Sequence, residues 1–321
     1  MPRVLLIGHI HADGVDRLNA LDRLEFEQIE DEQSPEIPAA VARSEAVLLR
    51  TAQLTPAMID GAPELKVVSR HGVGYDNVPV ERLNARKIPL AVAASANKIS
   101  VAENALMMML AMSKAALRYD REVRAGNWAV RNERASFELF GKNLLIVGFG
   151  RIGREVAKRA QAFAMKITVC DPYADKAEIK SLGYSAAGDL DTALADCDVV
   201  SLHLPKEAST ANLLDARRLA LLKPTAMVIN TARGGLIDET ALYEVLKSGQ
   251  LAAAGLDVFA QEPAAKDLPL YGLDNVIVAP HSAGVTQESM VRMATESAQN
   301  IVDILQGRLD PAVIVNWDHL R

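Results

Sequence analysis

The sequence predicts an α/β protein with a doubly wound parallel sheet and a second, separate α/β domain. An unbroken apolar run, Leu144–Val147, is typical of a strand buried on both faces. It leads into a glycine-rich turn, Gly148–Gly153, after which apolar residues recur at helical spacing. Short strands alternate with helices elsewhere, and 321 residues are enough for two domains with separate cores.

The turn has the spacing Gly148-x-Gly150-x-x-Gly153. Strand, glycine turn and helix in this order form the dinucleotide-binding fingerprint of a Rossmann-type domain. Gly148 allows the tight turn, Gly150 lets the backbone approach a pyrophosphate, and Gly153 lets the helix pack on the strand. The helix start, at Arg151 and Ile152, presents N–H groups and a partial positive charge to the phosphates.

The next predicted strand, Lys166–Cys170, ends at Asp171. A carboxylate there can accept hydrogen bonds from the adenosine ribose and repels a 2′-phosphate, which favours NAD over NADP. The alternative is a helix cap or turn former before Pro172. We favour the ribose role because the strand, turn, helix and acid follow in register.

Composition narrows the possible partners and compartment. The net charge is −6 and no Lys/Arg run occurs, which argues against a nucleic-acid surface. Cys170 and Cys197 lie in apolar runs and are interpreted as buried thiols, as in a reducing compartment. No signal-peptide pattern precedes the first strand, and the most apolar stretch, Ala105–Met112, is too short to cross a bilayer. We expect a cytoplasmic protein with no membrane partner, and we identify no metal ligands.

The first 95 or so residues show a strand–helix alternation that indicates a parallel sheet. The predicted strands are Val4–Ile7, Phe26–Ile29, Ala46–Leu49, Lys66–Ser69 and Ile88–Val92. The predicted helices are Asp13–Leu21, Pro38–Arg43, Pro56–Asp60 and Val80–Ala85.

Two loops in this region follow strands, Arg50–Thr55 and Arg70–Asn77. Ligands of open α/β sheets lie outside the carboxyl ends of strands. Gly72 and Gly74 would let a small anion approach the backbone. A plain glycine turn explains this loop equally well.

A long helix is predicted over residues 98–118, and it is apolar on more than one face. Such a helix is buried between domains or between subunits. Residues 119–140 are charged and irregular, and we interpret them as an arm, with a solvated loop as the alternative.

The alternation continues after the glycine turn. Predicted strands are Val199–Leu204, Ala226–Asn230, Ala253–Val258, Val276–Ala279 and a short last one, Ala312–Val315. Predicted helices are Asp238–Ser248, with Asp238 as N-cap, and Thr286–Gln306. His203 falls inside a predicted strand, where a structural role is the simpler interpretation.

Three strand-end loops of the second half carry Arg233, Glu262 and His281. In a doubly wound sheet such loops converge on one crevice. Hydride exchange with an alcohol carbon needs a proton donor and acceptor, for which a carboxylate-paired histidine is suited. Arginine provides a bidentate clamp for a substrate carboxylate. Taken singly, these residues could be a helix-end cation, a loop acid before proline and a polar core residue.

Together, these motifs resemble the D-isomer-specific 2-hydroxyacid dehydrogenase family, and most of all its phosphoglycerate dehydrogenase branch. The resemblance covers nearly the whole chain. The motifs that carry it are Gly148–Gly153 with Asp171, Asn230–Asp238, Leu256–Pro263, Ala279–Gly284, Ser69–Asn77 and Asn97–Glu103.

The resemblance implies that Arg233 binds the substrate carboxylate, that His281 is the acid/base and that Glu262 is its partner. Further cofactor contacts are expected from Thr231, Asp257 and His203, and substrate contacts from Arg50, Arg70, Val73, Gly74 and Asn97. In the phosphoglycerate branch, arginines that match Arg50 and Arg70 bind the substrate phosphate. An arginine of the arm, here Arg131 or Arg134, joins them across the dimer.

The resemblance also implies a flavodoxin-like substrate domain, residues 1–97 and 287–321, around a central NAD domain, residues 98–286. Homodimerisation is expected through the helix from residue 98 and the arm. Because no regulatory domain follows residue 321, serine feedback is not expected.

The expected activity is hydride transfer between NAD and a small (R)-2-hydroxy acid, with D-3-phosphoglycerate as first choice and hydroxypyruvate or glyoxylate reduction as second. A different class, an NAD-sensing corepressor-like binding protein, keeps the same fold and is the minor alternative. A methyltransferase-like fold would leave Arg233, Glu262 and His281 unexplained.

Overall fold

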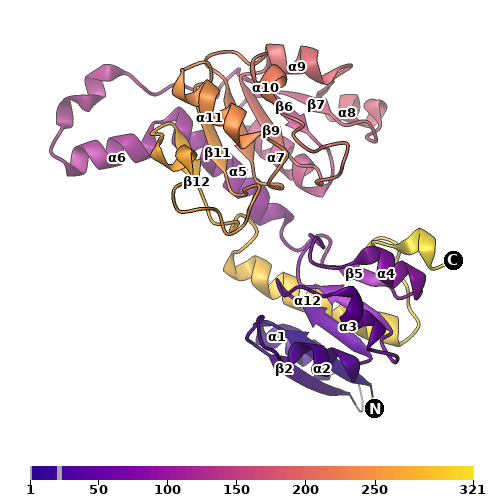
Figure 1. The fold of residues 1–321 in the computed structure, drawn as a ribbon. Coiled ribbons are helices and arrows are strands. Elements are labelled where there is room, and N and C mark those ends of the chain that lie inside the picture. Colours follow the sequence, from indigo (N-terminus) through magenta and orange to yellow (C-terminus); the bar gives the residue numbers. More distant parts are fainter. Residues whose placement is uncertain (1, 20–23) are drawn as a thin grey trace. The chain divides into compact units, whose positions relative to one another are not determined.

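The computed structural model describes residues 2–19 and 24–321, which form two compact units (Figure 1). The terminal unit combines residues 1–97 with residues 285–321, and the central unit comprises residues 98–284. Each unit contains a parallel sheet covered by helices, which confirms the predicted α/β class.

The terminal unit has a five-stranded sheet in the order β2-β1-β3-β4-β5, with every pairing parallel. This is the order of flavodoxin-like sheets. Its strands are β1 (Arg3–Ile7), β2 (Glu25–Ile29), β3 (Ala46–Leu49), β4 (Val67–Arg70) and β5 (Leu90–Val92). Its helices are α1 (Ala12–Asn19), α2 (Ile37–Ala42), α3 (Pro56–Asp60), α4 (Val80–Ala85), α12 (Gln287–Leu305) and the short η3 (Trp317–His319).

Both faces of this sheet are covered, and β1 shows why the four residues after Arg3 are all apolar. Successive residues of a strand point to opposite faces. Leu5 and Ile7 pack in the cluster that includes α2, α3 and α4, whereas Val4 and Leu6 pack in the cluster that includes α1 and α12. A run with no polar residue is therefore required.

The central unit has seven parallel strands in the order β12-β11-β10-β9-β6-β7-β8. Counted from β6, this is the Rossmann order with one further strand at the edge. The strands are β6 (Asn143–Val147), β7 (Lys166–Cys170), β8 (Ser185–Ala186), β9 (Val199–Leu202), β10 (Met227–Asn230), β11 (Ala253–Leu256) and β12 (Val276–Val278).

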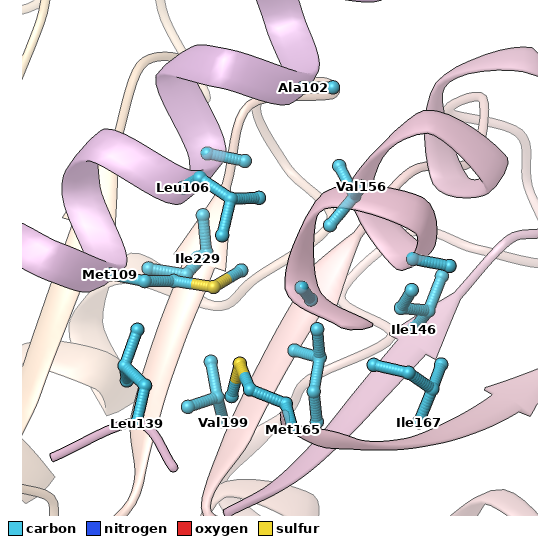
Figure 2. Packing of buried hydrophobic residues seen from close by; sticks show 14 of the residues in the cluster. Ala102, Leu106, Met109, Leu139, Ile146, Val156, Met165, Ile167, Val199 and Ile229 are labelled. Atoms are coloured by element: carbon cyan, nitrogen blue, oxygen red, sulfur yellow. The ribbon is translucent and has the colours of Figure 1, made fainter. Parts of the chain in front are cut away.

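Helices cover both faces of the central sheet as well. The helices of this unit are α5 (Lys98–Ser113), α6 (Ala116–Arg124), η1 (Trp128–Glu133), α7 (Arg151–Ala162), α8 (Lys176–Ser181), α9 (Leu190–Asp196), α10 (Ala216–Leu219), α11 (Glu239–Lys247) and η2 (Pro269–Gly272). Figure 2 shows Leu106 and Met109 of α5 in the same cluster as Val156 of α7 and Ile146 of β6. Leu145, the preceding strand residue, packs on the opposite face in the cluster of α9, α10 and α11.

The predicted bounds of the long helix and of the arm are wrong. The long helix ends at Ser113, because Ala115 adopts a left-handed conformation with φ +50° and a new helix, α6, begins at Ala116. The arm is therefore partly helical instead of irregular, through α6 and η1. Exposed ion pairs, including Arg124 with Asp120 four residues away, support α6.

The predicted last strand, residues 312–315, is a turn that makes one isolated antiparallel bridge, Ala91 with Ile314. Val313 and Ile314 donate their backbone N–H groups to the carbonyl of Asp310, which curls the segment. Helix α1 is described to Asn19, and the last two residues of the predicted helix, Ala20 and Leu21, lie outside the described residues. Among the residues that are described, no helix has both the length and the apolar character needed to cross a membrane.

Candidate active site

The loops that carry Arg233, Glu262 and His281 follow β10, β11 and β12, which are neighbours in the central sheet. Parallel strands end at the same edge, so these loops converge there. The backbone shows how closely two of them approach. A Cβ added to Gly234 would lie 1.6 Å from the carbonyl oxygen of Phe259, so only glycine permits this contact.

His281 and Glu262 form a hydrogen-bonded pair, with 2.7 Å between Nδ1 and Oε2. The other carboxylate oxygen of Glu262 accepts from the backbone N–H of Phe259 at 3.0 Å. Burial opposes ionisation of Glu262, but the hydrogen bonds from His281 and Phe259 outweigh it and lower its pKa. An ionised carboxylate only accepts hydrogen bonds, so Nδ1 of His281 is the donor and Nε2 remains for a substrate.

The same pair changes the protonation of the histidine. The hydrogen bond to Glu262 raises the pKa of His281 above its usual value, although burial and the charge of Arg233 oppose the shift. The two side chains are partly exposed, at 49% for His281 and 36% for Glu262. A histidine whose pKa is raised and whose ring remains accessible is suited to exchange a proton with a bound molecule.

Asp257 shapes the loop that carries His281. Its buried carboxylate accepts from the backbone N–H groups of Ser282 at 2.8 Å and Ala283 at 2.9 Å. Its own carbonyl accepts from the N–H of His281 at 2.7 Å, and His281 has φ +53°, a left-handed conformation that is uncommon for residues other than glycine. Burial raises the pKa of Asp257. These three bonds fix the backbone of the loop that carries the imidazole.

Arg233 is held by its own loop. Its Nη1 donates to the carbonyl of Ala232 at 2.7 Å, and its own carbonyl accepts from Nδ2 of Asn230 at 2.8 Å. Asn230 is not among the site residues predicted from the sequence, although its position at the end of β10, directly before Thr231-Ala-Arg-Gly-Gly, is the signal. The positive charge of Arg233 contributes to the pKa shifts of both Glu262 and His281, so the three groups interact electrostatically.

A surface hollow of about 550 Å³ lies beside the histidine–carboxylate pair. It is lined by Phe259, Glu262, Pro263, Ala264, Tyr271, Val278, Ala279, Pro280 and His281. The rings of Phe259 and Tyr271 meet edge to face, with their centroids 5.8 Å apart. The pair therefore lies at the edge of an apolar surface, where its charges are less screened than in open water.

The glycine turn at the end of β6 fits a dinucleotide. Gly148 has φ +93°, and a Cβ there would lie 2.3 Å from the carbonyl oxygen of His203. A Cβ at Gly153 would lie 2.1 Å from the carbonyl oxygen of Gly148, so helix and turn are in backbone contact. A Cβ at Gly150 would meet nothing within 4 Å among the atoms described, which leaves room for a pyrophosphate. Arg151 and Ile152 form the first turn of α7, as the fingerprint requires.

Asp171 has a structural role at this turn. Its carboxylate accepts from the backbone N–H groups of Phe149 at 2.6 Å, Tyr173 at 2.8 Å and Ala174 at 3.2 Å. The turn-forming role considered from the sequence is therefore present, and the acid is held against the glycine turn. A carboxylate has about four acceptor sites, so a ribose hydroxyl can still be accommodated.

Two further cofactor candidates lie at neighbouring strand ends. The hydroxyl oxygen of Thr231 is buried and has no hydrogen-bond partner within the described part of the chain, as expected of a group that a ligand would engage. His203 lies one residue beyond β9 and not inside a strand, which corrects the predicted strand end. Its Nε2 pairs with Oγ of Ser201 at 2.8 Å, and burial lowers its pKa to about 3.

The substrate candidates Arg50, Arg70, Val73, Gly74 and Asn97 belong to the terminal unit. Leu49 pairs with Arg70 across β3 and β4, so Arg50 and Arg70 lie at the same sheet edge. Arg70 donates from Nε to the carbonyl of Gly74 at 2.7 Å and from Nη1 to that of Leu49 at 3.0 Å. Its guanidinium thus holds the glycine loop, in which Val73 and Gly74 are half-buried.

Asn97 and His71 are two further polar residues of the terminal unit with buried side-chain atoms. Asn97 Oδ1 is buried without a hydrogen-bond partner among the described residues. His71, which the sequence analysis did not single out, is almost fully buried. Burial, followed by the charges of Arg50 and Arg70, lowers the pKa of His71 to about 4. Its imidazole is therefore neutral at pH 7.

Comparisons with known proteins identify the family. Residues 106–283 match the family model described as "D-isomer specific 2-hydroxyacid dehydrogenase, NAD binding domain". The chain belongs to this dehydrogenase family. It is 38% identical over 315 residues to the D-3-phosphoglycerate dehydrogenase of Mycobacterium leprae, covering 98% of this chain and 59% of that protein. The chain thus spans little more than half the length of such relatives.

Two other members of the dehydrogenase family match along their full length. The glyoxylate reductase of Korarchaeum cryptofilum is 33% identical over 320 residues, which is 98% of this chain and 96% of that protein. A D-lactate dehydrogenase from Aquifex aeolicus, solved with NAD and lactic acid, superposes with a TM-score of 0.86 at 28% identity. That match covers 97% of this chain and 98% of the other. The predicted family and its NAD-binding domain are thereby confirmed.

Proposed function

We propose that the protein is an NAD-dependent oxidoreductase that interconverts a small (R)-2-hydroxy acid and its 2-keto acid. The observation that carries the proposal is the His281–Glu262 pair, 2.7 Å apart, at the same sheet edge as the Arg233 loop. Family membership supports the same activity.

In reduction, bound NADH supplies a hydride to the carbonyl carbon of the substrate. Protonated His281 donates its Nε2 proton to the carbonyl oxygen, while Glu262 holds Nδ1 and stabilises the imidazolium. Arg233 binds the substrate carboxylate through its planar fork. In oxidation, neutral His281 accepts the hydroxyl proton. On this proposal the turn at Gly150 would hold the pyrophosphate and Asp171 would hold the adenosine ribose.

The test is an assay of purified protein with NADH against a panel of 2-keto acids, among them 3-phosphohydroxypyruvate, hydroxypyruvate, glyoxylate and pyruvate. We expect oxidation of NADH with at least one of them. Binding of NADH without turnover of any keto acid would instead favour the minor alternative, an NAD-sensing binding protein.

On substrate, D-3-phosphoglycerate is the first candidate. Its support is the 38% identity to phosphoglycerate dehydrogenases and the position of Arg50 and Arg70 at one sheet edge. Reduction of hydroxypyruvate or glyoxylate is the second candidate, and a specific observation favours it. The guanidinium of Arg70 already donates to the carbonyls of Gly74 and Leu49, which leaves fewer donors for a phosphate. The keto-acid panel separates the two.

We further propose that the terminal unit binds the substrate and that the protein is a cytoplasmic homodimer. A hollow of about 570 Å³ on the central unit supports the dimer. It is lined by Glu103, Leu106, Met107, Leu110, Ala111, Lys114, Ala116, Arg159 and Phe163. Met107 is 46% exposed and Phe163 is 42% exposed, so an apolar surface along α5 stays partly open to solvent among the described residues. The free thiols Cys170 and Cys197 suit a reducing compartment.

A further inference from the structure

A guanidinium lies close to Asp171, the acid that directly follows β7. Arg154, on α7, stacks its guanidinium on the ring of Phe149, 4.5 Å from the ring centroid. The backbone N–H of Phe149 donates to Oδ2 of Asp171 at 2.6 Å. One residue of the glycine turn therefore contacts both the carboxylate of Asp171 and the guanidinium of Arg154.

The guanidinium of Arg154 is engaged by a second carboxylate. Its Nη1 and Nη2 donate to the two oxygens of Glu178 at 2.5 Å and 2.8 Å, a bidentate pair. Glu178 belongs to α8, the helix that follows Asp171. The hydrogen bond to Glu178 raises the pKa of Arg154 against the effect of burial, and the charges of Glu178 and Asp171 add to the rise. Arg154 thus interacts with both acids.

We propose that Glu178 is a cofactor-specificity residue, which holds Arg154 in a bidentate pair and so withholds it from the 2′-phosphate of NADP. This inference rests on the proposed use of NAD. Where NADP is bound by this type of fold, an arginine near the end of the second strand accommodates the 2′-phosphate. In this protein the arginine is Arg154, and its guanidinium is already paired with the carboxylate of Glu178.

The charge balance explains how the two acids act together. Asp171 repels a 2′-phosphate directly, because both are anions. Glu178 pairs with the guanidinium that contacts Phe149, so that less of the positive charge of Arg154 is left to offset the negative charge of Asp171 at the ribose end of the site. Without Glu178, Arg154 would be available to offset part of that repulsion.

A simpler role for the pair is to join α7 to α8. The side chains are 39% and 45% exposed, and exposed ion pairs contribute little to stability. On that simpler role, removal of Glu178 would leave the relative affinity for the two cofactors unchanged. The two explanations therefore predict different ratios of NADPH to NADH affinity once Glu178 is removed.

The test uses Glu178→Gln, which keeps the shape of the side chain and removes its charge. Dissociation constants of NADH and NADPH are measured by fluorescence titration, and those of 5′-AMP and adenosine 2′,5′-bisphosphate by displacement of NADH. We expect affinity for NADPH and for the bisphosphate to rise about fivefold, with NADH and 5′-AMP nearly unchanged. In the double variant with Arg154→Gln the gain should disappear.

Glu27→Gln is the matched control, because Glu27 forms a similar exposed bidentate pair with Arg43 in the terminal unit. It removes the same charge and should leave all four affinities unchanged. An unchanged ratio of NADPH to NADH affinity in Glu178→Gln would overturn the inference but not the proposed function. A gain in NADPH affinity that persists in the double variant with Arg154→Gln would do the same. Failure of the unaltered protein to bind NADH would instead remove the proposed function on which it rests.

Discussion

At the scale of single residues, the hydrogen bond between Glu262 and His281 couples the proposed reaction to pH. Reduction uses protonated His281, which is present below its pKa, and oxidation uses the neutral form, which is present above it. The carboxylate raises that pKa, so the change occurs at a higher pH than for an isolated histidine.

We therefore predict that the rate of keto-acid reduction falls, and the rate of oxidation gains, as pH rises through the raised pKa of His281. Glu262→Gln should move the fall in reduction to lower pH, because it removes the charge that favours the imidazolium. Glu239→Gln is the control. Glu239 accepts from the N–H of Ala260 in the same loop, and the profile should stay in place. If both directions speeded up together with pH, the acid/base assignment of His281 would be wrong.

Arg233 provides a second prediction at this scale. Arg233→Lys keeps the charge and loses the planar fork, so kcat/KM for the keto acid should fall about tenfold or more. The dissociation constant of NADH should change little, because the proposed contact is to the substrate carboxylate. Steady-state kinetics and a separate NADH titration measure both. Unaltered kinetics would remove Arg233 from the site.

At the scale of elements, the glycine turn between β6 and α7 has two different requirements. Gly153 is needed for packing, because its Cα lies against the carbonyl of Gly148. Gly150 has open space where a Cβ would be, so its proposed role is to let a ligand approach. Packing within the chain thus requires glycine at position 153, whereas the proposed ligand requires it at position 150.

The prediction is that Gly150→Ala leaves the thermal unfolding temperature nearly unchanged and weakens NADH binding. Gly153→Ala should lower both, with a loss of stability of about 1–3 kcal/mol from overpacking. Thermal unfolding and NADH titration of the two variants provide the comparison, each variant serving as the other's control. Full NADH affinity in Gly150→Ala would contradict the proposed position of the pyrophosphate.

At the scale of the whole molecule, the apolar hollow along α5 bears on oligomeric state. Met107, Leu110 and Phe163 contribute to it, and Met107 remains substantially exposed within one chain. Burial of such a surface against a second copy is the proposed driving force of the dimer.

We predict a molar mass in solution of twice the 34.6 kDa chain, measured by light scattering or sedimentation. Met107→Asp should shift the protein to the monomer, since a buried unpaired carboxylate is costly. Leu182→Asp changes an exposed leucine outside this hollow and should leave the dimer intact. A monomeric unaltered protein would contradict the proposed assembly.

Much of this architecture follows from local patterns in the sequence. Val4–Ile7 of β1 and Leu144–Val147 of β6 have no polar residue because helices cover both faces of each sheet. Asp238 and Thr286 accept hydrogen bonds from the first turns of α11 and α12, as N-caps do. These signals act over a few residues, so they can be recognised without knowledge of the fold. The family motifs, including Gly148–Gly153, extend the same recognition to the cofactor domain.

Only the tertiary structure decided which polar groups meet. It shows that the guanidinium of Arg70 turns to its own loop, and that Glu178 pairs with Arg154 from another helix. It also shows that the long apolar helix stops at Ser113 although the apolar pattern continues. Each outcome depends on the packing of segments far apart in the chain, and that packing outweighs local preference. The sequence by itself therefore determined the elements, the fold class and the chemical groups of the candidate site. Only the tertiary structure decided which of these groups touch, because such contacts depend on distances between segments that no local pattern encodes.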